Sequence, residues 1–506
     1  MKKNLFMAID LGTSFIKAGV YDEIGECAAQ ASYPVKDYRP SPGIFIQKGE
    51  ELFESVISCM KNAREQLTDQ ADNIQAIVFS GQMAGFMGVS RNWDDITTWS
   101  CSLDSRYMPY AERQMSILKD DFLVIAGTNF PQMAPKFEWF KTEFPEEAKK
   151  IEKYLMISGY VIGKLGNLSI EDAVIDRSYL AWTGLSEISK DRWSTKICDA
   201  IGLDQKYLPK IVDCNFVCGK LCDEWAGATG LKSGIPLVAG AGDKVAGCLG
   251  SGSVQPGVIA FEASSYGEVS CSVSEYRPDT TDRRYDVLAS AIPGEFYVVH
   301  FAAGSGITLD WFVETFVKYP NESKNDAFIR IDKAAAEVPI GCNGLLASGL
   351  LAGSSMPLDG ISKGLWIGHD WSHGIGHFYR SLLESFAYDF ALAMDSMDRL
   401  YSDIDISTVR MIGGGARSSL WAQMNADVAQ KTYHTIKMKD VSMWGAVLLA
   451  GNAVGLFPNL KDTAVKMAVI DKTYKPDSER GLVYKKYKEI YKDFLNSMRV
   501  SFEKLS

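Results

Sequence analysis

The sequence predicts an α/β protein built from two similarly constructed domains. Amphipathic helical patterns alternate with short apolar strand patterns along the 506 residues. Residues 6–21 and residues 258–270 each combine an apolar strand, a carboxylate, a turn of small residues and a returning strand. A Gly/Ser stretch at 250–253 lies between these two copies. We therefore expect an N-terminal domain over residues 1–250 and a C-terminal domain over residues 251–506.

The spacing of apolar residues predicts the individual elements. Apolar side chains recur every three or four residues over residues 47–67, which indicates a helix. The β-branched run at 74–79 ends in Ser-Gly, which indicates a strand that stops at a loop. Further helices are expected over residues 378–397 and 420–431. A closing helix is expected over residues 482–502, where aromatic and aliphatic residues share one face.

Composition is that of an ordinary globular protein, with 46% hydrophobic and 23% charged residues. The chain has 53 Lys and Arg against 63 Asp and Glu, a formal net charge of −10. This balance argues against nucleic acid or an anionic membrane as the main partner. No stretch approaches the roughly 18 apolar residues of a membrane helix, and Asp10 interrupts the N-terminal apolar run too early for a signal peptide. We therefore expect a cytoplasmic location.

Two clusters of metal-ligating residue types are interpreted as structural. The C-x3-C-x3-C run over residues 214–222 lacks the paired C-x2-C spacing of a zinc site. Three histidines repeat every four residues over residues 369–377, but two glycines within this stretch disfavour a continuous helix by ~1 kcal/mol each. We expect neither cluster to bind a metal.

The tetrapeptide Asp10-Leu11-Gly12-Thr13 follows the first predicted strand and is the first candidate binding element. In a tight hairpin, the backbone N–H groups around Gly12 and the hydroxyl of Thr13 form a nest of donors suited to phosphate oxygens. Asp10 can hold a divalent cation directly or through water, because Mg²⁺ prefers few carboxylates and several waters. A plain β-turn capped by Asp10 is the alternative.

Residues 236–247 form the second candidate, an apolar strand that runs through glycines to Asp243. This order places Asp243 at the carboxyl end of a strand, where open α/β sheets bind ligands. Its carboxylate can accept a proton from a hydroxyl group, as the catalytic Asp of other phosphoryl transferases does. The alternative is an N-cap of the helix that follows.

The third candidate is a strand that ends in three consecutive glycines, within residues 409–419. Such a run permits a flat adenine or ribose to lie against the main chain. The chain contains no G-x-x-x-x-G-K-[ST] loop, and Val245 occupies the place of the third glycine in a dinucleotide fingerprint. Phosphate binding would therefore need a different scaffold.

In this order along the chain, the three motifs resemble those of the FGGY family of carbohydrate kinases. Residues 80–83, Ser-Gly-Gln-Met, are similar to the substrate loop of xylulokinase-like members. Residues 419–428 and 445–450 resemble the C-terminal region of the family, so the resemblance spans nearly the whole chain. It implies two actin-like ATPase (ribonuclease H-like) domains with a nucleotide and sugar cleft between them. It also implies transfer of the γ-phosphoryl group of ATP to a sugar hydroxyl.

The resemblance assigns roles to individual residues. It implies that Asp243 is the general base and that Asp10 is the carboxylate associated with Mg²⁺. The residues expected to bind ATP are Gly12, Thr13, Ser264, Ser265, Gly306, Asp310, Gly414, Gly415, Ala416 and Ser419. Those expected on the substrate side are Gln82, Met83, Trp99, Asp104, Arg106, Asp243 and Lys244. A small-molecule sugar is the expected partner, and a homodimer is a candidate assembly because relatives commonly dimerise.

Several positions depart from the pattern of the family. Ala84 stands where xylulokinases usually carry histidine, which removes a polar contact to the sugar. The family's Gly-Thr-Ser is replaced at 263–265 and its Glu-Arg-Thr-Pro at 354–357. Lys244 follows the base at a position where Asn or Gln is frequent. Its ammonium could pair with an anionic group of the substrate, reach solvent, or form a salt bridge between the domains.

We therefore expect a kinase for a ketose such as xylulose or ribulose. A polyol or a sugar acid is the alternative substrate within the family. A non-catalytic, nucleotide-dependent sugar sensor is the alternative of another class.

Overall fold

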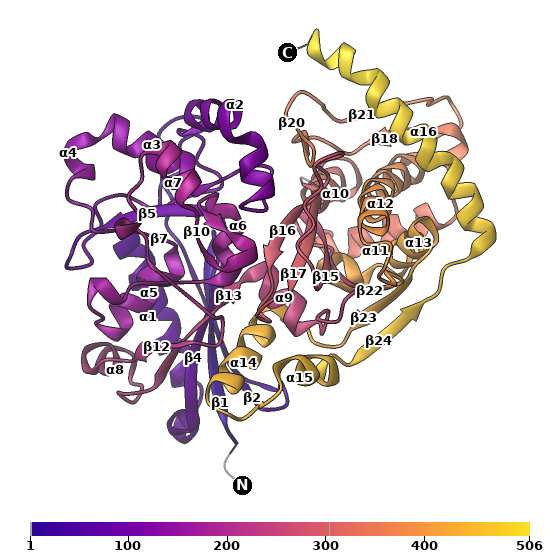
Figure 1. The fold of residues 1–506 in the computed structure, drawn as a ribbon. Coiled ribbons are helices and arrows are strands. Elements are labelled where there is room, and N and C mark those ends of the chain that lie inside the picture. The colour runs from indigo at the N-terminus through magenta and orange to yellow at the C-terminus, as the bar shows by residue number, and fades with distance from the viewer. Residues whose placement is uncertain (1–2, 303, 506) are drawn as a thin grey trace.

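Two lobes lie side by side in the computed structural model, which describes residues 3–302 and 304–505 (Figure 1). The N-terminal lobe contains a six-stranded sheet. Its strands, in spatial order, are β12 (Val217–Lys220), β13 (Pro236–Gly242), β4 (Ile74–Gly81), β1 (Leu5–Leu11), β2 (Phe15–Asp22) and β3 (Cys27–Pro34). The C-terminal lobe contains a seven-stranded sheet. Its strands, in spatial order, are β16 (Asp286–Ala289), β17 (Phe296–Ala302), β15 (Gly267–Val273), β14 (Val258–Glu262), β22 (Thr408–Ile412), β23 (Thr432–Ile436) and β24 (Ile470–Tyr474).

The two sheets are built in the same way. β1 pairs with β2 antiparallel and with β4 parallel, and β14 pairs with β15 antiparallel and with β22 parallel. The order β3-β2-β1-β4-β13 in the first sheet corresponds strand for strand to β17-β15-β14-β22-β23 in the second. This order confirms the duplicated α/β architecture that the internal similarity predicted.

The helices and the strand that the sequence pattern predicted are all present. They are α1 (Gly49–Glu65), β4, α12 (Ile375–Leu400), α13 (Ser419–Ala429) and α16 (Ser478–Glu503). The apolar stripe of α1 is buried against the first sheet, with Leu52, Val56 and Met60 all 0% exposed. Helix α12 begins at Ile375, directly after a glycine in extended backbone. The helix therefore includes only the last of the three histidines at 369–377.

The segment between β4 and β12 forms an additional helical region on the N-terminal lobe. Helices α2 (Met108–Val124) and α3 (Met133–Glu143) enclose a hydrophobic cluster of their own, which includes Phe122 and Phe137. The short strand β5 (Gly85–Val89) connects this region to the end of β4. This helical region, with its own hydrophobic cluster, therefore continues directly from the carboxyl end of β4.

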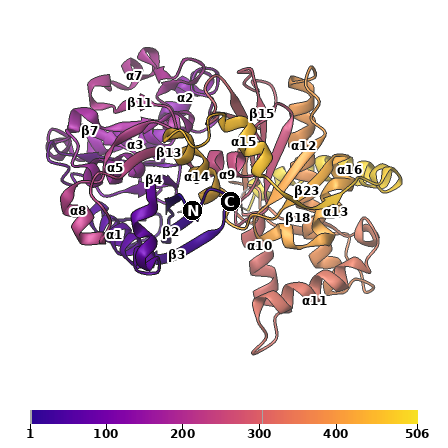
Figure 2. The ribbon, with the colours of Figure 1, turned by 90° about the horizontal axis from the view of Figure 1, so that it is seen from below.

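Two crossing helices, α9 (Asp243–Gly250) and α14 (Val441–Ala453), lie between the lobes (Figure 2). Their backbones approach so closely that a Cβ on Gly445 would lie 1.9 Å from the Ala246 carbonyl oxygen, and one on Gly250 2.0 Å from that of Val441. Helix α14 also contacts β1, β4 and β13 of the first sheet. The expected boundary near residue 250 therefore separates the two sheets, but α14 returns to the first one.

Among residues 3–302 and 304–505, the helices do not combine the length and hydropathy that a membrane span requires.

Candidate active site

Asp10 lies at the carboxyl end of β1, directly before the turn into β2. A Cβ on Gly12 would lie 2.6 Å from the Phe15 carbonyl oxygen, so the tight turn has no room for a side chain at that position. Across the hairpin Asp10 pairs with Lys17, whose ammonium lies 3.9 Å from its carboxylate. Burial, and then the neighbouring charge of Asp243, raises the pKa of Asp10 to about 7. The site therefore favours a cation beside this carboxylate.

Asp243 follows β13 and is the first residue of α9. Gly242 occupies the N-cap position, and the Asp243 carboxylate accepts a hydrogen bond from the adjacent Lys244 N–H at 2.8 Å. The alternative in which Asp243 is the N-cap is therefore not realised. Burial raises the pKa of Asp243 to about 6, and Lys244 opposes part of this rise. A carboxylate with this pKa is ionised at neutral pH and is able to accept a proton.

The two carboxylates lie at the same edge of the N-terminal sheet. β1 and β13 both run parallel to β4 and flank it, and Ser80 is the register partner of both Asp10 and Ala241. Neighbouring strands are about 4.8 Å apart, so only two strand spacings separate Asp10 from the end of β13. The electrostatic coupling between Asp10 and Asp243 agrees with this placement. The hairpin at 10–13 and Asp243 therefore face one region.

Polar side chains from three segments meet beside this edge. The Gln47 amide donates to the Thr13 carbonyl oxygen at 2.7 Å, and the Thr13 hydroxyl donates to Gln82 Oε1 at 3.3 Å. Trp99 is 0% exposed, and its backbone pairs with that of Gln47. Gln82 Nε2, Gln47 Oε1 and Trp99 Nε1 are buried without a hydrogen-bond partner. Met83 packs against Gly242, where a Cβ would lie 2.4 Å from Met83 Cγ.

Among these side chains, Gln82, Met83 and Trp99 were predicted on the substrate side. Gln47 was missed by the sequence analysis, because a single glutamine ahead of a helix carries no pattern that singles it out.

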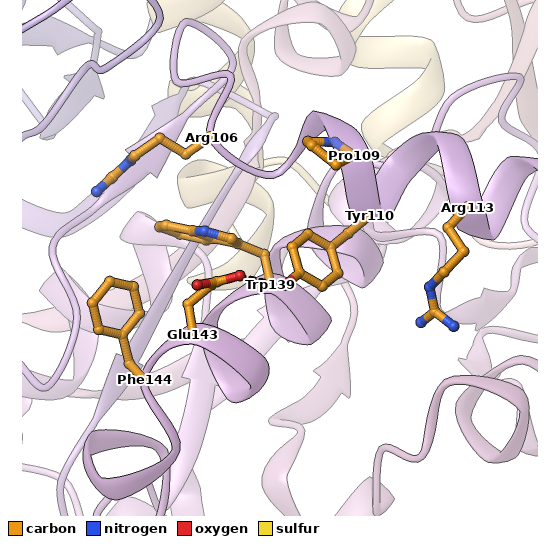
Figure 3. A pocket seen from close by; sticks show the side chains of 7 residues that line it. All are labelled: Arg106, Pro109, Tyr110, Arg113, Trp139, Glu143 and Phe144. Carbon is orange, nitrogen blue, oxygen red and sulfur yellow. Dashed lines mark hydrogen bonds between the residues drawn. The ribbon is translucent and has the colours of Figure 1, made fainter.

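Asp104 and Arg106, both expected on the substrate side, pair with each other in the structure. The Arg106 guanidinium donates two hydrogen bonds to the Asp104 carboxylate, at 2.8 and 2.7 Å, and Asp104 also accepts from the Ser100 hydroxyl. The guanidinium lies 4.6 Å from the centre of the Trp139 ring. Arg106 and Trp139 line a shallow cavity of about 570 Å³ (Figure 3), together with Tyr110 and neighbouring residues. The charges of Asp104 and Arg106 therefore neutralise each other within one loop, and their contact with the substrate stays a prediction.

Lys244, which was also expected on the substrate side, pairs with two carboxylates of the other lobe. Its ammonium lies 2.7 Å from Glu262 and 3.4 Å from Glu268, both in the C-terminal lobe. The salt bridge between domains, one of the alternatives for its charge, is therefore the one that the structure contains.

A cavity of about 560 Å³ in the C-terminal lobe collects most of the residues expected to bind nucleotide. It is lined by Ser264, Ser265, Gly306, Asp310, Gly414 and Gly415. A Cβ on Gly306 would lie 2.3 Å from the Ser264 carbonyl oxygen, so α10 (Ser305–Phe312) begins directly against the β14–β15 turn. Trp421 and Phe328 supply aromatic surface to the same cavity. Glycine backbone, hydroxyls and aromatic rings together suit a flat base with attached phosphates.

Some expectations about this cavity are changed by the structure. Ala416 and Ser419 are not among the residues that line it, and the Ser419 hydroxyl accepts from Tyr474 at 3.1 Å. Helix α11 (Lys324–Ala336) forms one wall, and Lys324 pairs with Asp310 at 2.6 Å. The sequence analysis missed this wall, because α11 carries no glycine-rich or hydroxyl-rich motif.

In the part of the chain that the structure describes, no group of three or more His, Cys, Asp or Glu side chains is arranged to hold a metal ion. His373 contacts the Cys342 carbonyl oxygen at 3.0 Å through Nε2. The thiols of Cys214, Cys218 and Cys222 are free.

Residues 5–250 match the N-terminal domain of the FGGY family of carbohydrate kinases, and residues 264–454 match its C-terminal domain. The chain belongs to the FGGY family. Because both halves of the sequence match domains of this family, the protein is a carbohydrate kinase, as the order of its motifs predicted.

Curated and solved relatives agree with this assignment. The chain is 27% identical to a xylulose kinase of Bacillus subtilis, over 98% of this chain and 99% of that one. The structure of a ligand-bound xylulose kinase from Lactobacillus acidophilus superimposes with a TM-score of 0.90 at 21% identity, covering 99% and 100% of the two chains. A gluconate kinase from the same organism superimposes with a TM-score of 0.89 at 21% identity, covering 99% of each chain.

The residues present fit the groups that sugar kinases of this family use, ATP and a divalent metal. The glycine-lined cavity has the size and lining for a nucleotide. Asp10 alone at the hairpin suits a cation that keeps most of its waters and takes other ligands from phosphate oxygens.

Proposed function

We propose that this FGGY kinase phosphorylates a neutral ketose, of the size of xylulose or ribulose, with Asp243 as the general base. The observation that carries the proposal is the set of unpartnered polar atoms on Gln47, Gln82 and Trp99 beside the hairpin that contains Thr13. Buried polar groups are rarely left without partners, and an exception needs an explanation. Two N–H donors and one amide acceptor match the hydroxyl groups of a sugar.

The charges near this set favour a neutral sugar over a sugar acid. The Arg106 guanidinium is engaged by Asp104, and the buried Lys136 ammonium donates to the Ser100 and Cys101 carbonyl oxygens at 2.9 and 2.8 Å. Burial lowers the pKa of Lys136 to about 8, so it stays mostly protonated at neutral pH, but two of its three N–H donors are already taken by these carbonyl oxygens. A substrate carboxylate would therefore have to break one of these interactions.

The proposed mechanism assigns one task to each group. ATP, when bound, supplies the phosphoryl group. Asp243 accepts the proton of the attacking hydroxyl, and Asp10 would hold Mg²⁺ at the hairpin. The N–H groups around Gly12, and the hydroxyls of Ser264 and Ser265 on the opposite lobe, would bind phosphate oxygens. Phosphoryl transfer asks the protein mainly for positioning and charge stabilisation, and this arrangement provides both.

The experiment is an ADP-release assay with xylulose, ribulose, glycerol and gluconate, in the presence of ATP and Mg²⁺. We expect kcat/KM for a ketose to exceed that for gluconate and glycerol by at least about tenfold, the effect of one unpaired buried polar group. Preference for gluconate would overturn the assignment to neutral sugars. Tight ATP binding with no turnover of any compound would favour the sensor instead.

A further inference from the structure

Lys244 occupies an unusual electrostatic position at the junction of the two lobes. It is the second residue of α9, directly after the proposed base, and its side chain is only 15% exposed. The ammonium reaches across to the C-terminal lobe, where it pairs with Glu262 of β14 and Glu268 of β15. A lysine is rarely buried unless its charge is paired, so this contact is a built feature of the site.

The two glutamates need a cation between them. Glu262 and Glu268 are register partners on adjacent antiparallel strands, and like charges directly opposite each other destabilise a sheet. Glu268 is 2% exposed, and its burial raises the pKa of its carboxyl, an effect that Lys244 opposes. Burial alone would lower the pKa of Lys244, but Glu262, Glu268 and Asp243 together hold it well above its ordinary value. The ammonium therefore remains charged.

The duplicated fold shows why this cation comes from the other lobe. In the N-terminal hairpin, Asp10 faces Lys17, so its carboxylate has a cation on the neighbouring strand. In the C-terminal hairpin, the equivalent carboxylate, Glu262, faces Glu268 instead. The cation missing from the second hairpin is supplied by Lys244 from α9 of the first lobe.

The region around Lys244 is otherwise acidic. Asp10 and Asp243 interact with Glu262 through their charges, and Glu268 interacts with both Glu262 and Asp243. Lys17, the cation beside Asp10, has a side chain that is 45% exposed. A nucleotide that brings several negative charges into this region would meet like charge from four carboxylates. Closely placed like charges weaken binding, especially where water is excluded.

We propose that Lys244 is a resident counter-cation of the cleft, which neutralises Glu262 and Glu268 so that the phosphates of a nucleoside di- or triphosphate can bind between the lobes. Lys244 is thus a positioning residue for the nucleotide and has no contact with the sugar. The inference rests on the proposed function only in taking the cleft to be the phosphate site.

The test measures binding of Mg²⁺-ADP by isothermal titration calorimetry, so that it does not depend on which sugar is turned over. We expect Lys244→Met to weaken binding at least about tenfold, or about 1.4 kcal/mol. Lys244→Arg, which keeps the charge, is expected to stay within about threefold of wild type. The double variant Lys244→Met with Glu262→Gln removes one cation and one anion, and we expect it to recover most of the lost affinity.

The matched control is Lys488→Met, which removes another largely buried lysine that pairs with a carboxylate, Asp395, at 2.6 Å. This pair joins α16 to α12, so the variant reports a loss of stability alone and should bind Mg²⁺-ADP like wild type. Unchanged affinity in Lys244→Met, equal losses in both lysine variants, or no recovery in the double variant would each overturn the proposal.

If neither Lys244→Met nor the double variant folds, the affinity of the Glu262→Gln variant for Mg²⁺-ADP tests the proposal instead. Tighter Mg²⁺-ADP binding than wild type would support the charge argument, and weaker binding would contradict it. A wild-type protein that binds Mg²⁺-ADP and phosphorylates no sugar would count against the proposed function, while the comparison of the Lys244 variants would still stand.

Discussion

Replacing Asp243 by asparagine tests the proposed base and its environment together. Burial raises the pKa of Asp243 from 3.8 to about 6. A difference of this size corresponds to about 3 kcal/mol, and we take about 1–3 kcal/mol because the residue is half-buried beside a region open to solvent. Because the folded-state pKa is raised, ionisation of Asp243 destabilises the fold as the pH rises through 6. Asparagine avoids this penalty and keeps nearly the same shape.

Asp243→Asn is therefore expected to lower kcat by about 10²–10⁴ and at the same time to raise the free energy of unfolding by about 1–3 kcal/mol at pH 8. At pH 4 the native carboxyl is largely protonated, so most of the stability difference should vanish. Thermal unfolding at pH 4, 6 and 8, with ADP release at pH 8, measures both effects. A variant that is both less stable than wild type at pH 8 and still active would refute the reasoning about this carboxylate.

Three further predictions follow from the same geometry. Wild-type kcat should fall about tenfold per pH unit below pH 6, because the raised pKa of Asp243 leaves the base protonated there; a flat profile from pH 5 to 8 would contradict its role. Gln82→Leu removes a buried, unpartnered donor and should lower kcat/KM for the sugar by about tenfold to a hundredfold, with KM for ATP unchanged in the same assay. Gly306→Ala places a Cβ 2.3 Å from the Ser264 carbonyl oxygen and should raise KM for ATP at least about tenfold, whereas an unchanged KM would show that this turn does not meet the nucleotide.

The sequence is sufficient to place the two central carboxylates, and the reason lies in strand direction. Asp10 lies at the end of one short apolar strand and Asp243 directly follows another, and both strands prove to be parallel neighbours of β4. Parallel strands end at one edge of the sheet, so the two residues meet although more than two hundred residues separate them. The short internal similarity was likewise enough to predict two similarly built domains, whose sheets prove to share one strand order.

Contacts between side chains of different segments were not accessible in the same way. The family resemblance named Asp104 and Arg106 as two substrate ligands, and it gave no sign that these two residues pair with each other through two hydrogen bonds. Gln47 and the wall formed by α11 reach the site only through tertiary packing. The local sequence pattern predicts helices, strands and the points where strands end. Which charged side chains pair depends on which surfaces the fold brings together.

The β1–β2 and β14–β15 hairpins are duplicated elements that differ in how their carboxylate is paired. In the first hairpin the carboxylate of Asp10 retains partial exposure and only a distant lysine, 3.9 Å away, which leaves coordination sites for an exchangeable cation. In the second hairpin the carboxylate of Glu262 is held by Lys244 at 2.7 Å, a cation that cannot leave. Because a fixed ammonium occupies the second position, the proposed divalent ion would be directed to the first, on the lobe that also carries Asp243. The asymmetry between the hairpins would thus account for the proposed metal site in one lobe and the proposed phosphate-binding turn, without a metal of its own, in the other.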